Sequence, residues 1–119
     1  MKVHSWDRSE RENLGPLVVR RVIHSERMTT ALFDLKKGAV VPRHSHDNEQ
    51  MSHVHTGKAL YQFDDREVTA GPGEVVEINS NEPHRVEALE DSCIMDVFQP
   101  VRADWLVGDD AYLRNQSDE

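Results

Sequence analysis

The sequence contains a single cysteine, Cys93, among its 119 residues. One thiol excludes an internal disulfide and a zinc site built from several thiolates. Cys93 stands in the apolar run 93–95, which predicts a small buried side chain in preference to a nucleophile. Any metal chemistry therefore has to come from other side chains.

Long apolar runs and an excess of positive charge are also lacking. No run approaches the ~20 residues of a membrane span, and residues 1–10 contain no signal-peptide core. The net charge of −8 argues against nucleic acid and anionic membranes as partners, because both need clustered Lys and Arg. We expect a cytoplasmic protein that acts on a small molecule, and any acidic substrate would have to be held by a local cation.

Length and composition predict one folded domain. A chain of 119 residues can bury one core but not two. Short β-rich segments recur along it, separated by Gly, Pro, Asn and Asp, which predicts an all-β fold with an antiparallel sheet that is closed or sandwiched. The expected strands are residues 17–23, 28–35, 40–46, 50–56, 59–63, 67–70, 74–78, 84–88 and 93–98.

This pattern divides the chain into three parts. Residues 1–16 are predicted to form an N-terminal arm anchored by Trp6, and residues 17–100 a β-barrel. Residues 101–119 are predicted to form a C-terminal tail with helical turns at 102–106 and 109–114.

The most informative stretch is residues 38–57, GAVVPRHSHDNEQMSHVHTG. His44 and His46 occupy alternate positions of an expected strand, so they should face the same way with Cα atoms ~7 Å apart. Gln50 has the same parity but would lie ~20 Å away along a straight strand. Residues 47–49 must therefore turn for Gln50 to join the histidines, and Asp47 and Asn48 suit such a turn.

A third imidazole, His84, completes a candidate metal site with His44, His46 and Gln50. Three nitrogens and one oxygen suit one divalent transition metal ion, and zinc, nickel, manganese and iron all remain candidates. Glu49 is the rival oxygen ligand, but it has the wrong parity.

Two further histidines lie in the same stretch. His53 and His55 have odd parity relative to Gln50, so we expect them on the outer face of the strand or at a subunit contact.

A second informative segment spans residues 95–102. Asp96 and Phe98 share a strand face, and an aspartate in an apolar strand costs free energy unless it is hydrogen-bonded, exposed or functional. If this face looks into the metal pocket, Asp96 is a proton carrier and Phe98 a wall; otherwise Asp96 caps a strand end or pairs with an arginine. Arg102 could hold a substrate carboxylate through two hydrogen bonds, or form a surface ion pair.

The wider pattern resembles both sequence motifs of the cupin superfamily, with Gln50 where the first motif usually has glutamate. Over residues 6–106 it resembles the KdgF family of small single-domain cupins, which act in pectin degradation. The motif residues are Gly38, His44, His46, Gln50, Gly57, Gly73, Pro83, His84, Asp96, Phe98 and Arg102. The resemblance implies a double-stranded β-helix, or jelly-roll barrel, with short C-terminal helical turns. It implies His44, His46, Gln50 and His84 as metal ligands, and Asp96, Phe98 and Arg102 as catalytic residues.

The activity implied by the resemblance is the ring opening of 4,5-unsaturated uronates to linear 5-keto-4-deoxyuronates. A neutral Gln50 would leave the ion a stronger Lewis acid, which favours a non-redox lyase or isomerase step. A cupin dioxygenase, a polyketide cyclase-like enzyme and a sugar-binding module without turnover remain the alternatives. We also expect a homodimer, because exposed sheet edges and outward-facing apolar residues need covering.

Overall fold

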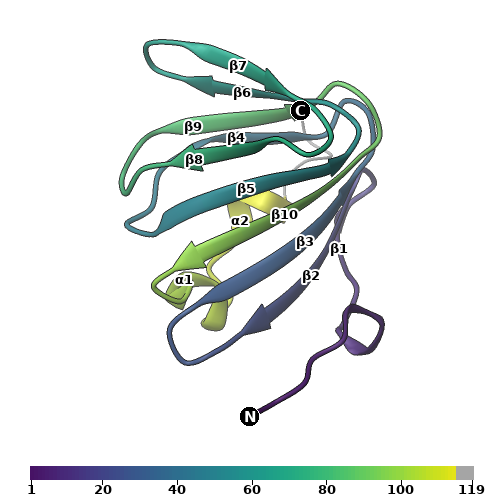
Figure 1. Ribbon diagram of the computed structural model, residues 1–119, viewed down its shortest axis with the longest axis vertical. Coiled ribbons are helices and arrows are strands. Elements are labelled where there is room, and N and C mark those ends of the chain that lie inside the picture. Colours follow the sequence, from purple (N-terminus) through teal and green to yellow (C-terminus); the bar gives the residue numbers. More distant parts are fainter. Residues whose placement is uncertain (115–119) are drawn as a thin grey trace.

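The computed structural model describes residues 1–114 (Figure 1). It confirms the all-β prediction: the described residues form two antiparallel sheets with short helices at the C-terminal end. The part of the predicted tail at 115–119 falls outside the described residues.

The larger sheet has the strand order β1-β2-β3-β10-β5-β8. Its members are β1 (Glu12–Gly15), β2 (Val18–His24), β3 (Thr29–Leu35), β10 (Ser92–Gln99), β5 (Glu49–Thr56) and β8 (Val75–Ile78). The smaller sheet has the order β4-β9-β6-β7. Its members are β4 (Val40–His44), β9 (His84–Ala88), β6 (Ala59–Phe63) and β7 (Glu67–Ala70). In Figure 1 the smaller sheet occupies the upper part of the molecule and most of the larger sheet the lower part.

The core lies between the inner faces of the two sheets. In β3 the alternate residues Ala31, Phe33 and Leu35 are buried, and β10 contributes Ile94 and Phe98 from the neighbouring strand. Such alternation is what a strand with one covered face requires. The functional side chains described below lie on this same inner surface, toward one end of the barrel.

Gly57, in the turn between β5 and β6, permits a close approach of two chain segments. Its φ is +87°, and a Cβ built on it would lie 2.2 Å from Ser92 Oγ and 2.4 Å from the carbonyl oxygen of Asp91. Only glycine avoids both the conformational strain and this overlap. The turn therefore fixes where β5 and β6 stand relative to the start of β10.

The barrel begins earlier than the sequence analysis placed it. Residues 12–15, assigned there to the N-terminal arm, form β1 and pair with β2, with Glu12 opposite Arg20. Edge strands are held by backbone hydrogen bonds and can be polar, so Glu12 and Asn13 gave no strand signal. Only Leu14, 1% exposed, reaches the core from β1. The 3₁₀ helix η1 (Trp6–Arg8) precedes it, and Trp6 is half-buried.

After β10 the chain forms α1 (Ala103–Leu106) and α2 (Ala111–Arg114), close to the two predicted helical turns. In Figure 1 both helices lie behind the β5–β10–β3 part of the larger sheet. Helix α2 contacts β4 and β1, which belong to different sheets, and Trp105 and Leu113 join the core. Among residues 1–114, no helix has the length and apolar character that crossing a membrane would require.

Candidate metal centre and its surroundings

Three histidines converge at one end of the barrel. His44 ends β4 and pairs in register with His84, the first residue of β9. His46 lies just beyond β4, in the connection to β5. One ring nitrogen from each of the three residues lies within 4.8 Å of the other two, so the three side chains could hold one metal ion.

The route by which His46 reaches the site differs from the prediction. Strand β4 ends at His44, so the two histidines do not share a strand face by simple alternation. The chain bends at residues 47 and 48. The His46 carbonyl accepts a hydrogen bond from the Asn81 backbone N–H at 2.7 Å, which ties this bend to the connection between β8 and β9.

Hydrogen bonds orient all three imidazoles in the same way. The Nδ1 atoms of His44, His46 and His84 lie 2.7, 3.1 and 2.8 Å from the backbone carbonyl oxygens of residues 42, 48 and 82. A carbonyl oxygen only accepts, so each Nδ1 must carry the proton, and each Nε2 keeps its lone pair. Metal-binding histidines are typically oriented by such a hydrogen bond on the second ring nitrogen.

Gln50 brings an oxygen to the same point. It is 4% exposed on the inner face of β5, and its Oε1 lies 3.1 Å from Nε2 of His46. With the His46 proton on Nδ1, Nε2 and Oε1 are both acceptors, and a pair of acceptors at this separation suits a metal ion bound by both. The rival ligand Glu49 is exposed on the opposite face. The turn at residues 47 and 48 thus brings Gln50 next to the histidines, as predicted.

The pocket keeps the imidazoles neutral. Burial lowers the pKa of His44 to about 3 and that of His46 to about 4, and the proximity of His84 and of the Arg102 guanidinium lowers both pKa values further. The pKa of His84 is lowered as well, chiefly by burial. Because only the neutral ring can ligate, these shifts suit a metal site. The donor set of three nitrogens and an amide oxygen therefore fits a divalent transition metal ion.

Asp96 points into the barrel from β10, opposite Ser52 of β5. Its Oδ1 is shielded from solvent and has no hydrogen-bond partner among the described residues. Burial raises the pKa of Asp96 to about 6, against the lowering effects of Ser52, Gln50 and Arg102. A carboxyl group with this pKa can both accept and donate a proton near neutral pH.

Phe98 and Arg102 stand next to one another beside this carboxyl group. Phe98 is 2% exposed, and its ring meets that of His46 edge to face at a centroid distance of 5.6 Å. The guanidinium carbon of Arg102 lies 4.7 Å from the centroid of the Phe98 ring and 4.2 Å from that of Trp105. Arg102 is 1% exposed, so it is not the surface residue that one sequence interpretation allowed.

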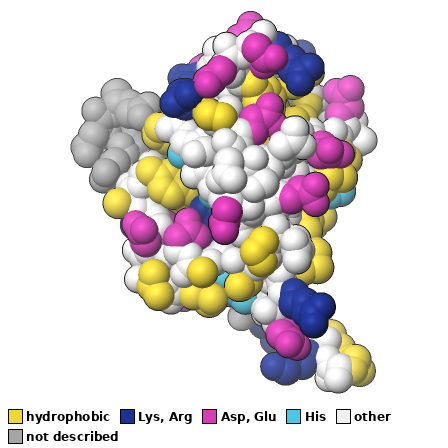
Figure 2. Space-filling model, turned by 90° about the vertical axis from the view of Figure 1, so that its left-hand side faces the viewer, with side chains coloured by type: hydrophobic (Ala, Val, Ile, Leu, Met, Phe, Trp, Pro, Cys, Tyr) yellow, Lys and Arg dark blue, Asp and Glu magenta, His cyan; other side chains and the backbone are white. Residues whose placement is uncertain are grey.

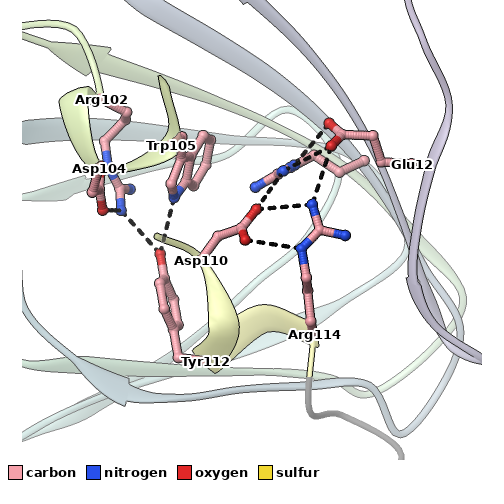
Figure 3. Close-up of polar contacts among 8 residues, drawn as sticks. Glu12, Arg102, Asp104, Trp105, Asp110, Tyr112 and Arg114 are labelled. Carbon is pink, nitrogen blue, oxygen red and sulfur yellow. Dashed lines mark hydrogen bonds and ion pairs between the residues drawn. The ribbon is translucent and has the colours of Figure 1, made fainter. Parts of the chain in front are cut away.

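The Arg102 guanidinium already has partners within the chain (Figure 3). Its Nε and Nη2 donate to the two carboxylate oxygens of Asp104 at 3.0 and 2.7 Å. Its Nη2 also donates to the hydroxyl of Tyr112 at 2.9 Å. Burial alone would lower the pKa of Arg102, but Asp104 and Tyr112 raise it above its usual value. The guanidinium thus remains charged inside the pocket.

A cavity of about 40 Å³ lies beside the histidines. Of the seven predicted site residues, all except His46 line it. Sequence reasoning missed Ser52, Tyr61, Trp105 and Tyr112, which line it too. Ser52 shares the parity of Gln50 and could have been found from that signal. The hydroxyl groups of Ser52 and Tyr61 form a hydrogen bond across the barrel, with 2.6 Å between Ser52 Oγ and Tyr61 Oη.

A charged cluster next to this pocket ties α2 to the barrel (Figure 3). Asp110 Oδ2 accepts from Nη2 of Arg20 at 2.7 Å, and the two side chains are each 3% exposed. Arg114 donates to Asp110 through Nε at 2.8 Å and reaches Glu12 at 3.3 Å. Glu12 also pairs with Arg20 at 3.1 Å. We call these four residues the α2 latch.

His53, His55 and Cys93 lie on the outer face of the larger sheet, away from the site. His53 is half-buried and His55 exposed, on the outer face of β5 as parity predicted. Cys93 is half-buried on the outer face of β10, where burial and the nearby Asp34 raise the pKa of its thiol. A thiol that stays protonated is a poor nucleophile, as predicted, but the predicted buried position of Cys93 is wrong, because its side chain is only half-buried.

Comparison with known proteins identifies the family. A family model described as a cupin domain matches residues 31–98, more than half of the chain. The chain therefore belongs to the cupin family, as its motifs predicted. None of the curated protein sequences matches it.

Solved structures share the fold. KdgF from Halomonas sp. superimposes with a TM-score of 0.77 at 24% identity, covering 83% of this chain and 94% of that protein. An RmlC-like cupin from Shewanella frigidimarina gives a TM-score of 0.80 at 20% identity, with 86% and 93% covered. Oxalate decarboxylase from Bacillus subtilis gives 0.75 at 19% identity and covers 82% of this chain, which spans 29% of that protein. The TM-scores show a common fold, and they confirm the predicted likeness to KdgF at the level of the fold.

Proposed function

We propose that this chain is a metal-dependent cupin enzyme that opens 4,5-unsaturated uronates to linear 5-keto-4-deoxyuronates. The observation that carries the proposal is the convergence of three oriented imidazoles on one point beside an inward-facing carboxyl group. His44, His46 and His84 would hold the metal ion, with Gln50 as the fourth ligand. A bound divalent ion would supply a Lewis acid to a substrate oxygen.

The reaction needs a group that moves protons. The hydroxyl on C1 loses its proton, its O–H electrons form the C1 carbonyl, and the bond between C1 and the ring oxygen breaks. Its electrons pass to the ring oxygen, which becomes the C5 carbonyl as C4 takes up a proton. Asp96 suits both transfers, because its pKa of about 6 leaves acid and base forms accessible near neutral pH. The products contain the same atoms as the substrate.

Because the protein is negatively charged, binding of an acidic substrate needs a positively charged side chain in the pocket. The chain has a net charge of −8, and Figure 2 shows Asp and Glu side chains scattered over the middle of one face, with Lys and Arg gathered toward its upper and lower ends. Such a surface repels a uronate at long range. Arg102, which lines the cavity, would supply the attraction at short range.

The test is an assay on a 4,5-unsaturated uronate that follows loss of the enol-ether ultraviolet absorbance. We expect metal-loaded protein to remove the absorbance, a chelator to stop the reaction, and added metal to restore it. Oxygen consumption is measured in parallel, because a dioxygenase would require it and ring opening does not. No loss of absorbance with stoichiometric metal bound would reject the proposal.

The proposal includes assembly as a homodimer through the outer face of the larger sheet. Apolar side chains gather on the outward positions of five neighbouring strands: Ile23, Leu32, Met51, Val75, Met95 and Val97. Met51 and Val75 are 39% and 44% exposed. Covering this face with a second copy would remove apolar surface from water.

Sedimentation velocity tests this assembly. We expect wild-type protein to sediment as a dimer and Met95→Lys, a change at the centre of the face, to sediment as a monomer with unchanged metal content. A wild-type monomer at micromolar concentration would contradict the proposed dimer.

A further inference from the structure

The hydroxyl of Tyr112 occupies a position that suits an anionic oxygen. It accepts hydrogen bonds from Nη2 of Arg102 at 2.9 Å and from Nε1 of Trp105 at 3.3 Å (Figure 3). The Tyr112 ring lies against His44, with 4.7 Å between centroids and 34° between planes. Tyr112 therefore sits between the proposed metal ligands and the arginine.

The cavity is too small for a sugar acid while Tyr112 holds this position. Its volume is about 40 Å³, whereas pockets that bind small molecules usually measure ~300–1,000 Å³. Arg102, Trp105, Tyr112 and Leu113 all line it from the C-terminal segment. A substrate that is to reach both the histidines and Arg102 must displace part of this segment, and Tyr112 stands directly in the way.

One edge of the Arg102 guanidinium, formed by Nη1 and Nη2, is available to a ligand. Asp104 pairs with the Nε and Nη2 side of the guanidinium and fixes its orientation. The other edge consists of Nη1, which donates to none of the described residues, and the second hydrogen of Nη2, which Tyr112 accepts. A carboxylate could use this edge with two parallel hydrogen bonds.

Removal of Tyr112 would leave two donors unpaired inside the pocket. The N–H groups of Arg102 and Trp105 would both lose their acceptor, and unpaired buried donors are costly. A carboxylate oxygen in the same place would accept both, and it would bind more strongly than a neutral hydroxyl because charge-assisted hydrogen bonds are stronger.

We propose that Trp105 Nε1 and the free edge of Arg102 form the carboxylate subsite for a sugar acid, and that Tyr112 is the residue which the ligand's carboxylate displaces. The inference rests on the proposed function for the class of ligand. It adds Trp105 as a residue that determines specificity for an acid over a neutral sugar. It also assigns Tyr112 as the group that fills the subsite when no ligand is bound.

The test uses a ligand that cannot undergo the ring opening. Binding of D-galacturonate and of its neutral methyl ester to metal-loaded protein is measured by calorimetry. Trp105→Phe keeps an aromatic ring but removes the N–H, and it should weaken galacturonate binding ~10- to 100-fold, the effect of losing one hydrogen bond to a charged group. Binding of the ester should not change. Trp6→Phe makes the same replacement in η1, away from the pocket, and should bind like the wild type.

Tyr112→Phe tests the displacement. This variant keeps the ring against His44 but removes the competing hydroxyl, so galacturonate should bind several-fold more tightly than to the wild type. A wild-type measurement needs no variant: the indole N–H resonance of Trp105 should shift on addition of galacturonate and stay in place with the ester. The resonance is assigned by its absence from the spectrum of Trp105→Phe.

Several outcomes would overturn the inference. These are no binding of galacturonate, equal affinity in wild type and Trp105→Phe, an unmoved Trp105 resonance, or weaker binding to Tyr112→Phe. Failure of the proposed function looks different. If galacturonate binds as expected while the unsaturated uronate is not opened, the subsite stands and the ring-opening reaction is rejected.

Discussion

Replacing Asp110 with asparagine should loosen the C-terminal segment and lower the stability of the whole chain. Asp110 is the buried carboxylate of the α2 latch, and it contacts both cations at the shorter distances, Arg20 at 2.7 Å and Arg114 at 2.8 Å. The change keeps the size of the side chain but removes its charge. Arg20 would then keep only Glu12, whose side chain is 25% exposed. Nη1 of Arg20 is already buried without a partner.

The expected loss follows from the burial of the pair. Removing one partner of a buried ion pair typically costs ~3–5 kcal/mol, because the other charge is left uncompensated. Since Glu12 still neutralises part of the Arg20 charge, we expect about 3 kcal/mol, at the low end of that range. For a chain of this length such a loss corresponds to a fall of roughly 10 °C in Tm.

The loss should depend on pH with a defined sign. Burial alone would raise the pKa of Asp110, but Arg114 and Arg20 lower it below its usual value. A carboxylate with a lowered pKa stabilises the fold above its unfolded pKa of ~3.9, and this contribution disappears as the pH falls through the folded pKa. The difference between wild type and Asp110→Asn should thus be full at pH 7 and shrink below about pH 4.

Urea unfolding at pH 7 and at pH 3 measures both effects. Asp109→Asn is the matched control, because the neighbouring aspartate is exposed and its replacement should change stability little. If Asp110→Asn were as stable as Asp109→Asn at pH 7, the latch would contribute nothing. An equal loss at both pH values would show that the charge of Asp110 is not its cause.

Three further predictions concern the turn, the metal and the proton carrier. Gly57→Ala should destabilise the chain by about 3 kcal/mol or more in a urea titration, because backbone strain adds to steric overlap with β10. Gly38→Ala is the control for strain alone, because Gly38 has φ +92° and open space around it. His44→Ala with His46→Ala should abolish metal binding, measured by elemental analysis after dialysis, and stoichiometric metal in the double variant would refute the ligand assignment. Asp96→Asn should keep the fold and the bound metal, but its turnover rate should fall ~10²- to 10⁴-fold. Near-wild-type turnover would show that Asp96 has only a structural role.

The strands and most of the candidate metal site could be predicted because they follow local rules. Alternation placed Asp96 and Phe98 on one face and His53 on the other, and the structure agrees with each position. The turn between His46 and Gln50 followed from the distance that the chain has to cover. In these cases the side-chain direction depends only on position within a strand or on a short turn.

The C-terminal segment could not be predicted in the same way. Its two helical turns were found, but nothing local shows that Tyr112 lies against His44, which is far from it in sequence. That contact depends on where the chain leaves β10 and on the pairing of Asp110 with Arg20, a residue 90 positions away. Arg20 occupies an inward-facing position of β2, where a core residue is expected. The sequence alone does not explain an arginine there, because its partners Glu12 and Asp110 are known only from the structure.

Trp105 links the α2 latch to the carboxylate subsite. The guanidinium carbon of Arg20 lies 4.7 Å from the centroid of its ring, and that of Arg102 lies 4.2 Å away. The indole thus contacts one cation that holds α2 through Asp110 and another that contacts Tyr112. Because packed side chains have few alternative arrangements, a ligand that displaces Tyr112 must either leave Trp105 in place, with the latch closed, or shift it and disturb Arg20. In the first case the displacement is confined to the Tyr112 side chain. In the second case the affinity for the substrate depends on the stability of the latch.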